Sequence, residues 1–393
     1  MSQIAFVRIF PLAIPLHKAF SHAAHVRRMA DPVVVQVELA DHTVGYGEAL
    51  ARDYVTGETA ETVVANIRGM MPEVLLRFRP RLFAEALEMI EQLPVIDRNG
   101  RGMPAARAAV ELALLDAYSR HFRRPLGEAV GWLGLAGLGP PGSVEAVRFS
   151  GVLSGDDLGR LRSSVRKMRW FGLHDFKLKV GFADDVERIR TVAGYLGRSL
   201  GRSTTLRLDA NGGWTLERAV EVLRAVQDLP IRCVEQPLPR EQDGQLPELK
   251  NATPFALMAD ESLVTIGDGQ RLIDEHAVDI FNIRVSKNGG LLSALKLAHL
   301  AMKNNVDYQL GCMVGETGIL SAAGRRFLEN MPRVLFAEGS YGRFLLTGDI
   351  VDRPVQFGWG GKGRPLEGLG WGIEVQPERL ERYAVVKMIE IPL

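Results

Sequence analysis

Five charged residues close five successive apolar segments of this chain at nearly equal intervals. They are Lys179, Asp209, Glu235, Asp260 and Lys287. Successive members are 30, 26, 25 and 27 residues apart, which leaves room in each interval for a strand, a helix and two loops. The carboxyl ends of the strands in a parallel barrel converge on one mouth, where catalytic residues collect. The spacing therefore predicts an α/β barrel with three carboxylates and two lysines at its mouth.

The region from 143 to 372 alternates short apolar runs with amphipathic helical patterns, as parallel α/β domains do. Strands are predicted at 147–152, 175–180, 205–209, 233–236, 255–260, 280–285, 307–312 and 334–337. Eight strands with helices between them favour a closed barrel over an open sheet. A barrel needs roughly 250 residues, so a chain of 393 residues is expected to contain a second domain.

Residues 1–130 have a different pattern, which predicts an α+β capping domain. Antiparallel strands are expected at 4–10, 33–39 and 44–48, followed by helices over 59–93 and 104–122. The stretch 131–142 is rich in Gly and Pro and is the predicted linker. The tail, about 373–393, contains one more strand without a following helix. We expect that strand to return to the N-terminal domain.

Composition excludes several classes of partner. The net charge of +1 gives no sign of a nucleic acid or an anionic membrane as partner. No apolar run approaches the ~20 residues that span a bilayer, and the N-terminus does not have the pattern of a signal peptide. Cys233 and Cys312 both fall in predicted barrel strands, where buried free thiols are expected. These observations predict a cytoplasmic protein.

The three acids are suited to a hard dication. Mg²⁺ prefers oxygen ligands and keeps positions for water and substrate, so Asp209, Glu235 and Asp260 form a candidate metal site. Any one of these acids alone could instead cap its following helix or form a local ion pair. Local roles do not explain why all three close apolar strands at similar spacing.

The lysines are candidate bases. Strand alternation places Lys177 and Lys179 on one face, and burial beside other cations lowers a lysine pKa. Lys287 would approach from the opposite side of the barrel. It could equally bind a phosphate near Gly289 and Gly290.

Taken together, these motifs resemble the enolase superfamily, and within it the muconate lactonizing enzyme subgroup. The resemblance covers almost the whole chain. The motifs are Lys177-x-Lys179, Asp209-Ala210-Asn211-x-x-Trp214, Val234-Glu235-Gln236-Pro237, Ala259-Asp260-Glu261-Ser262 and Lys287-x-Gly289-Gly290, with Gly45-x-Gly47-Glu48 nearer the N-terminus.

The resemblance implies a modified (β/α)7β barrel that uses Mg²⁺, with Mn²⁺ as a possible substitute, and a Lys base. It implies that Asp209, Glu235 and Asp260 bind the metal and that Lys179 and Lys287 are bases on opposite faces of the substrate. Lys177 would neutralise the developing enolate. Asn211 and Glu261 would hold the ligands in place.

The substrate is less defined. In this subgroup two loops close over the mouth, here expected at 16–31 and 49–59, so His22 and Tyr54 are candidate substrate contacts. A solvated basic loop is an equal alternative for the first. Glu316, after the seventh strand, and Ser340, after the eighth, are further candidates. Many dipeptide epimerases of the subgroup carry an Asp-x-Asp pair after the eighth strand. The sequence Glu338-Gly339-Ser340-Tyr341 does not contain it, which favours N-acylated substrates or acids without an amino group.

The predicted reaction is removal of the proton α to a substrate carboxylate. Racemisation or epimerisation of an N-acylated amino acid or related acid ranks first, muconate-type cycloisomerisation second, and dehydration of a hydroxy acid or acid sugar third. A Schiff-base aldolase using Lys179 or Lys287, and a barrel that only binds ligands, are the competing classes. The expected partners are a small carboxylate and further copies of the chain in a homo-oligomer.

Overall fold

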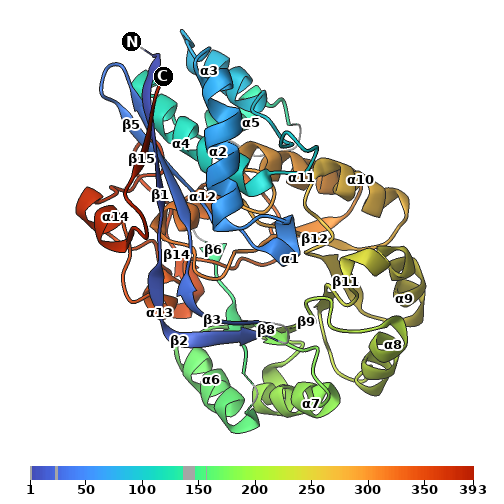
Figure 1. Ribbon diagram of the computed structural model, residues 1–393. Coiled ribbons are helices and arrows are strands. Elements are labelled where there is room, and N and C mark those ends of the chain that lie inside the picture. The colour runs from blue at the N-terminus through green and yellow to red at the C-terminus, as the bar shows by residue number, and fades with distance from the viewer. Residues whose placement is uncertain (1, 23–24, 136–146, 156) are drawn as a thin grey trace.

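A computed structural model describes residues 2–22, 25–135, 147–155 and 157–393. The capping domain contains an antiparallel sheet with strand order β15-β1-β4-β5. Its strands are β1 (Ile4–Pro11), β4 (Val33–Leu39), β5 (Val44–Ala49) and β15 (Ile389–Pro392). The C-terminal strand β15 pairs with β1, so both ends of the chain meet in this sheet (Figure 1). The expected return of the tail is thus seen.

The longer helices of this part of the molecule are α2 (Ala60–Leu75), α3 (Phe83–Glu91), α4 (Pro104–Phe122) and α5 (Glu128–Trp132). The predicted helix 104–122 is confirmed residue for residue, with Pro104 at its first turn. Helix α4 lies directly on β5. A Cβ atom at Gly45 or Gly47 would come within 2.0–2.7 Å of α4 backbone atoms, so only glycine permits this approach.

The barrel sheet is parallel, with strand order β7-β8-β9-β10-β11-β12-β13. The strands are β7 (Gly151–Leu153), β8 (Asp175–Lys179), β9 (Thr205–Asp209), β10 (Cys233–Glu235), β11 (Ala256–Ala259), β12 (Ile280–Ile283) and β13 (Asp307–Leu310). Each is followed by a helix: α6 (Leu158–Trp170), α7 (Asp185–Leu196), α8 (Leu216–Ala225), α9 (Leu246–Ala252), α10 (Ile266–Asp274), α11 (Leu291–Lys303) and α12 (Gly318–Asn330). Short 3-10 turns lie at η1 (Gly197–Ser199), η2 (Arg240–Gln245) and η3 (Trp359–Gly361).

The barrel closes through Ala337, which bridges Leu310 on one side and Phe149 on the other. Among the described residues after Ala337, the next helix is α13 (Gly342–Leu345), only four residues long, and the last is α14 (Pro377–Tyr383). The architecture is the expected modified (β/α)7β barrel with a capping domain (Figure 1).

Several local predictions differ from the structure. The expected strand 147–152 is divided into β6 (Val147–Arg148) and β7, and β6 pairs outside the barrel with β14 (Lys362–Gly363). The segment 334–337 forms isolated bridges instead of a strand. The expected loop 16–31 is a hairpin of β2 (Ile14–His22) and β3 (His25–Ala30), because its two halves supply each other's backbone hydrogen bonds. The loop 49–59 contains the short helix α1 (Asp53–Thr56). Most of the predicted linker lies within 136–146, outside the described residues.

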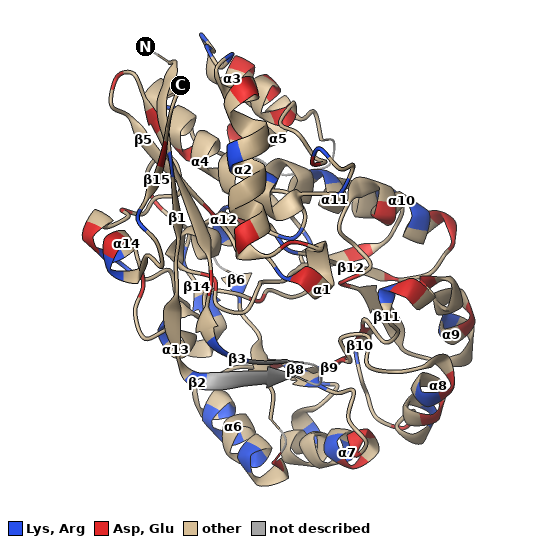
Figure 2. Cartoon of the chain, in the orientation of Figure 1, with Lys and Arg blue, Asp and Glu red and all other residues tan. Residues whose placement is uncertain are grey.

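Charges of both signs are interspersed on the outer helices (Figure 2), in keeping with a net charge of +1. In the described part of the chain, no helix is both long and apolar enough to cross a membrane.

Candidate active site

The carboxyl ends of four neighbouring strands bring the predicted residues together. Lys177 and Lys179 lie on β8, Asp209 ends β9, Glu235 ends β10, and Asp260 directly follows β11. In the sheet, Lys179 is opposite Asp209, and Asp209 is opposite Glu235. All five side chains are buried. The spacing of the sequence therefore corresponds to a real cluster.

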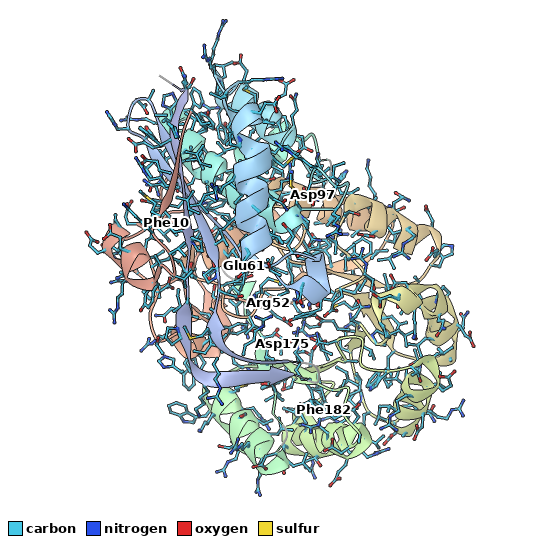
Figure 3. All side chains as sticks on the ribbon, in the orientation of Figure 1. Phe10, Arg52, Glu61, Asp97, Asp175 and Phe182 are labelled. Carbon is cyan, nitrogen blue, oxygen red and sulfur yellow. The ribbon has the colours of Figure 1, made fainter. Side chains whose placement is uncertain are left out.

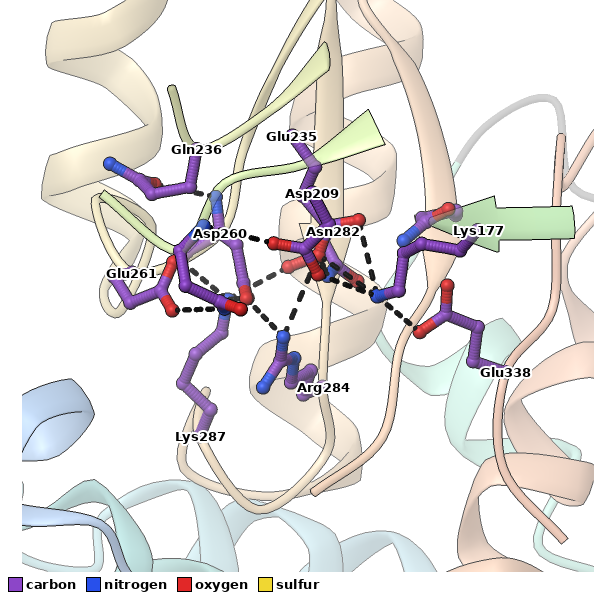
Figure 4. A network of polar contacts seen from close by, with 12 residues as sticks. Lys177, Asp209, Glu235, Gln236, Asp260, Glu261, Asn282, Arg284, Lys287 and Glu338 are labelled. Atoms are coloured by element: carbon purple, nitrogen blue, oxygen red, sulfur yellow. Dashed lines mark hydrogen bonds and ion pairs between the residues drawn. The ribbon is translucent and has the colours of Figure 1, made fainter. Parts of the chain in front are cut away.

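Lys177 is at the centre of this cluster (Figure 4). Its Nζ lies 2.7 Å from Glu338 Oε2, 3.1 Å from Asp209 Oδ2 and 3.2 Å from Glu235 Oε1. Burial opposes the charged form, but these carboxylates outweigh it and raise the pKa of Lys177 well above its usual value. Lys177 therefore stays protonated and acts as a fixed positive charge.

Lys179 has fewer partners than Lys177. Its Nζ donates to Asp209 Oδ2 at 2.6 Å and to Asn211 Oδ1 at 2.8 Å. The intervening Leu178 packs in the apolar core, so the two lysines share the inner face as strand alternation predicts.

Lys287 lies in the turn after β12 and is fully buried. Its Nζ donates to the backbone oxygen of Asp260 at 2.7 Å, to Asp260 Oδ1 at 2.9 Å and to the backbone oxygen of Asn282 at 2.8 Å. Burial lowers the pKa of Lys287, and the charge of Asp260 opposes this. In this arrangement all three N–H donors of the ammonium group have partners.

Arg284 follows β12 and was not predicted to belong to the site. Its guanidinium contacts Asp260 Oδ2 and lies 3.6 Å from Glu235 Oε1. Asn282, two residues earlier, donates to Glu235 Oε1 at 2.8 Å. The carboxylates are therefore held by Lys177 on one side and by Arg284 on the other.

The pKa values of the three acids depend on which cations they meet. Burial raises the pKa of Asp209, but Lys179 and Lys177 more than compensate and lower it below its usual value. Arg284 and Lys287 likewise lower the pKa of Asp260 against the effect of burial. Glu235 is the exception, since burial and the charge of Asp209 raise its pKa to about 8.

The donor set fits a hard dication in its chemistry. Three carboxylates lie at adjacent strand ends, and burial together with the charge of Asp209 raises the pKa of Glu235, an effect that a cation among them would oppose. The arrangement itself differs from a formed metal centre. Within the described residues, no group of three or more His, Cys, Asp or Glu side chains stands ready to hold a metal ion. The reason is that Arg284 and Lys177 occupy the oxygens that a metal would take.

A cavity of about 540 Å³ opens above this cluster. Lys177, Lys179 and Arg284 line it, together with the predicted supporting residues Asn211 and Glu261. Asn211 Nδ2 donates to Glu261 Oε1 at 3.0 Å, and burial together with the charge of Asp260 raises the pKa of Glu261 to about 7. Lys287 is not among the lining residues, because it lies on the far side of Asp260.

The capping domain supplies part of the cavity wall. Tyr54 and Arg52 from the region of α1, and Arg27 from β3, line it. Arg52 Nη1 lies 2.8 Å from Asp31 Oδ1. Figure 3 shows Arg52 above the barrel opening. His22 ends β2, in the same hairpin as Arg27.

Two predicted substrate contacts lie elsewhere. Glu316 accepts a hydrogen bond from the backbone N–H of Met313 at 2.7 Å, and burial raises its pKa to about 8. Ser340 accepts from Arg325 at 3.2 Å. Both line a small separate cavity and are not part of the wall of the larger one. Their side chains turn toward local partners, so contact with a substrate remains a prediction without support from this cavity.

Sequence reasoning missed Glu338, Arg207, Asn282 and Arg284 as parts of the network. Arg207 Nη2 lies 3.0 Å from Glu338 Oε1, and these side chains lie below Lys177. A signal was present, since Arg207 lies two residues before Asp209 and so on the same face of β9. Glu338 follows a segment that forms only bridges, and alternation gives no guide there.

Comparison with known proteins places the chain in a family. Residues 4–131 match the mandelate racemase / muconate lactonizing enzyme N-terminal domain, and residues 160–379 match the enolase C-terminal domain-like family. The chain belongs to the enolase superfamily. The resemblance to its muconate lactonizing branch is confirmed.

Three relatives show the breadth of this branch. An N-succinyl-L-Arg/Lys racemase of Bacillus cereus is 27% identical over 82% of this chain and 83% of its own length. The crystal structure of an N-succinyl Arg/Lys racemase from the same organism covers 99% of this chain and 100% of its own, at 25% identity and with a TM-score of 0.87. Muconate cycloisomerase 1 of Pseudomonas putida is 28% identical over 97% of both chains. A dipeptide epimerase of Enterococcus faecalis, solved with Mg and the dipeptide L-Leu-L-Tyr, has a TM-score of 0.82 at 25% identity, covering 95% of this chain and 99% of its own. All three are isomerases.

Proposed function

We propose that this enolase-superfamily protein removes the proton α to the carboxylate of an N-acylated amino acid or a related acid and returns it to racemise or epimerise the substrate. The observation that carries the proposal is the cavity lined by Lys177 and Lys179, whose Nζ atoms contact the buried carboxylate of Asp209, with Glu235 also in contact with Lys177. The similarity to an N-succinyl amino acid racemase supports the substrate class. So does the Glu338-Gly339-Ser340-Tyr341 sequence, which offers no Asp-x-Asp pair for a free ammonium group.

Asp209, Glu235 and Asp260 would hold a Mg²⁺ ion, with Mn²⁺ as a possible substitute, once Arg284 has moved away from Asp260. The ion would neutralise the charge that develops on the substrate carboxylate when the α-proton leaves. The Mg found with the similar dipeptide epimerase supports this choice.

The residues of the chain then divide the work. Lys179 faces the cavity and takes the α-proton on its amino group, which Asp209 and Asn211 orient through hydrogen bonds. Lys177 remains a cation beside the substrate carboxylate, because Glu338 and Glu235 hold its proton in place. We assign to Lys287 the return of the proton on the opposite face. For that role it must give up one of its contacts with Asp260 and turn toward the cavity.

Muconate-type cycloisomerisation is the alternative. In sequence, a muconate cycloisomerase aligns with 97% of this chain and the racemase with 82%, although the structure of the racemase covers 99%. In that reaction one lysine is needed for proton transfer and the other serves electrostatically, so the outcome of single substitutions separates the two proposals.

The test follows the substrate α-proton in D₂O by NMR, with N-acyl amino acids, dipeptides, hydroxy acids and cis,cis-muconate as candidates and with MgCl₂ present. We expect deuterium incorporation and loss of optical activity with an N-acyl amino acid. In that case Lys179→Ala and Lys287→Ala each stop net racemisation, yet each still exchanges the enantiomer that faces the remaining lysine. Lactone formation from muconate without racemisation would favour the alternative. Wild-type racemisation by both variants would overturn the two-base site.

We further propose that the protein acts in the cytoplasm as a homo-oligomer. Gel filtration with light scattering tests the second point directly, since a monomer would exclude it.

A further inference from the structure

The wall of the cavity opposite the polar cluster is aromatic. Phe171, Tyr341, Phe344 and Phe357 line it, with Trp170 at its outer end. These rings contact one another edge to face or tilted, with Phe344 to Phe357 at 5.5 Å, Tyr341 to Phe357 at 5.8 Å and Phe171 to Phe344 at 6.3 Å between centroids. We call this set of five rings the aromatic slot.

The slot exists because the barrel has no full-length eighth helix. Directly after Ala337 the first helix is the four-residue α13, and Tyr341 and Phe344 come from this turn. Phe171 and Trp170 come from the end of α6. The position that an eighth helix fills in a complete barrel is therefore left to side chains, and one continuous cavity runs from Lys179 to Trp170.

Exposure distinguishes this wall from an ordinary core. Trp170 is 75% exposed and Phe344 is 50% exposed, and Trp359 beside Trp170 is 59% exposed. When an apolar group binds among water-exposed rings, apolar surface of the rings is removed from water, and this removal favours binding. Phe357, by contrast, is buried and forms the inner end of the slot.

One polar side chain in the lining of this cavity lacks a hydrogen-bond partner among the described residues. Ser150 is fully buried and lines the cavity, and its Oγ has no hydrogen-bond partner among the residues that the structure describes. The backbone oxygen of the same residue accepts from the Tyr341 hydroxyl at 2.7 Å, which fixes its position. A buried hydroxyl without a partner is costly, so a ligand amide at this point would gain a hydrogen bond.

We propose that the aromatic slot binds a bulky apolar or aromatic group of the substrate, with the Ser150 hydroxyl on its amide. The substrate class becomes N-acyl amino acids that carry a large apolar group, on the acyl chain or on the side chain. This rests on the proposed function, because the carboxylate end is taken to lie beside Lys177 and Lys179.

The test measures affinity and turnover separately in the presence of MgCl₂. Dissociation constants from calorimetry are compared for N-acetylalanine, N-(3-phenylpropanoyl)alanine, N-acetylphenylalanine and N-succinylalanine, and α-proton exchange in D₂O is followed for each. We expect at least one phenyl compound to bind about tenfold to a hundredfold tighter than N-acetylalanine, as large apolar contacts do. Which of the two binds tighter tells whether the acyl chain or the side chain occupies the slot.

Substitutions show whether the aromatic slot causes the preference for phenyl compounds. Phe344→Ala and Trp170→Ala, both at exposed positions that tolerate substitution, should each cut the phenyl preference at least threefold. Leu82→Ala removes an apolar side chain that is 61% exposed on the capping domain and should leave the preference unchanged.

Equal affinity for all four compounds would overturn the slot, and so would tightest binding of N-succinylalanine, which would point to Arg27 and Arg52. Association of two copies through these rings is a third outcome. It would appear as no phenyl preference together with a smaller particle for Phe344→Ala in sedimentation, and it too would overturn the proposal. Tighter binding of a phenyl compound without any α-proton exchange would support the slot and overturn the proposed function. Exchange of the α-proton without tighter binding of a phenyl compound would support the proposed function and overturn the slot.

Discussion

Buried carboxylates occur in two places in this molecule, and their partners differ. Those at the barrel mouth face cationic side chains, and those between the barrel and the capping domain face helix N-termini. At the mouth, Asp209 and Asp260 face lysine and arginine side chains, which lower their pKa values despite burial. Between the domains, Glu48 accepts from Thr317 N at 2.9 Å, Thr317 Oγ1 at 2.7 Å and Leu320 N at 2.9 Å, all at the start of α12. Its burial dominates and raises its pKa to about 7.

Glu58 repeats the second pattern, since it accepts from Ala105 N and Ala106 N at the start of α4. Glu111 combines the two, because it accepts from Leu292 N at the start of α11 and also pairs with Arg107. Helix N-termini present unpaired N–H groups and a partial positive charge. Such acids therefore dock helices, whereas acids opposite lysine and arginine side chains can exchange those partners for a metal or a substrate. The comparison separates structural acids from chemical ones.

Metal removal should have the largest effect at the mouth. Dialysis against a chelator is expected to reduce α-proton exchange close to the uncatalysed background, because the metal would supply most of the positive charge that stabilises the developing negative charge. Added MgCl₂ should restore it, while circular dichroism stays unchanged throughout. Full activity after exhaustive chelation would show that the mouth acids are structural too.

Lys179→Ala should lower the rate of exchange of the enantiomer whose α-proton faces Lys179 about 10²- to 10⁴-fold, the usual contribution of a general base. Lys303→Ala, at an exposed position near the end of α11, is the matched control and should exchange at the wild-type rate. Thermal unfolding of the two variants should be similar. Exchange of that same enantiomer at the wild-type rate by Lys179→Ala would contradict the assignment of the base.

Glu48→Ala should act on stability instead. It leaves two backbone N–H groups and one hydroxyl buried at the start of α12 without an acceptor, which costs about 2–4 kcal/mol in the free energy of unfolding. Urea unfolding measures this, with Glu61→Ala on the exposed side of α2 as a control that should change little. A loss of exchange activity without loss of stability would place Glu48 among the chemical acids.

The smallest expected effect is on pH dependence. Because burial raises the pKa of Glu48 from its model-compound value of 4.5 to about 7, the folded state binds this proton more tightly than the unfolded state. The contribution of Glu48 is therefore fully present below pH 4.5 and declines as pH rises toward 7. The difference in unfolding free energy between wild type and Glu48→Gln should fall over that range. A difference that grows with pH would mean that the helix N-terminus, not burial, controls this carboxyl.

Regular parts of the fold could be predicted from local pattern. Helix 104–122 was predicted residue for residue, since Pro104 marks its start and its apolar spacing runs uninterrupted to Phe122. Strand 205–209 was predicted equally well. The hairpin at 14–30 was not predicted. Strands β2 and β3 are defined by their pairing with each other, and a local sequence does not show which segment it pairs with.

The same division holds for the site. The sequence by itself determined that Lys177, Lys179, Asp209, Glu235 and Asp260 meet, because strand ends spaced for βα units can only converge on one barrel mouth. Only the tertiary structure decided what surrounds them. Arg284 between two acids, Glu338 beneath Lys177 and the aromatic slot at the missing eighth helix all join segments far apart in the chain. The spacing of residues along the chain reflects the repeat of strands and helices and so predicts where strands end. Contacts between distant segments depend on how those strands and helices pack.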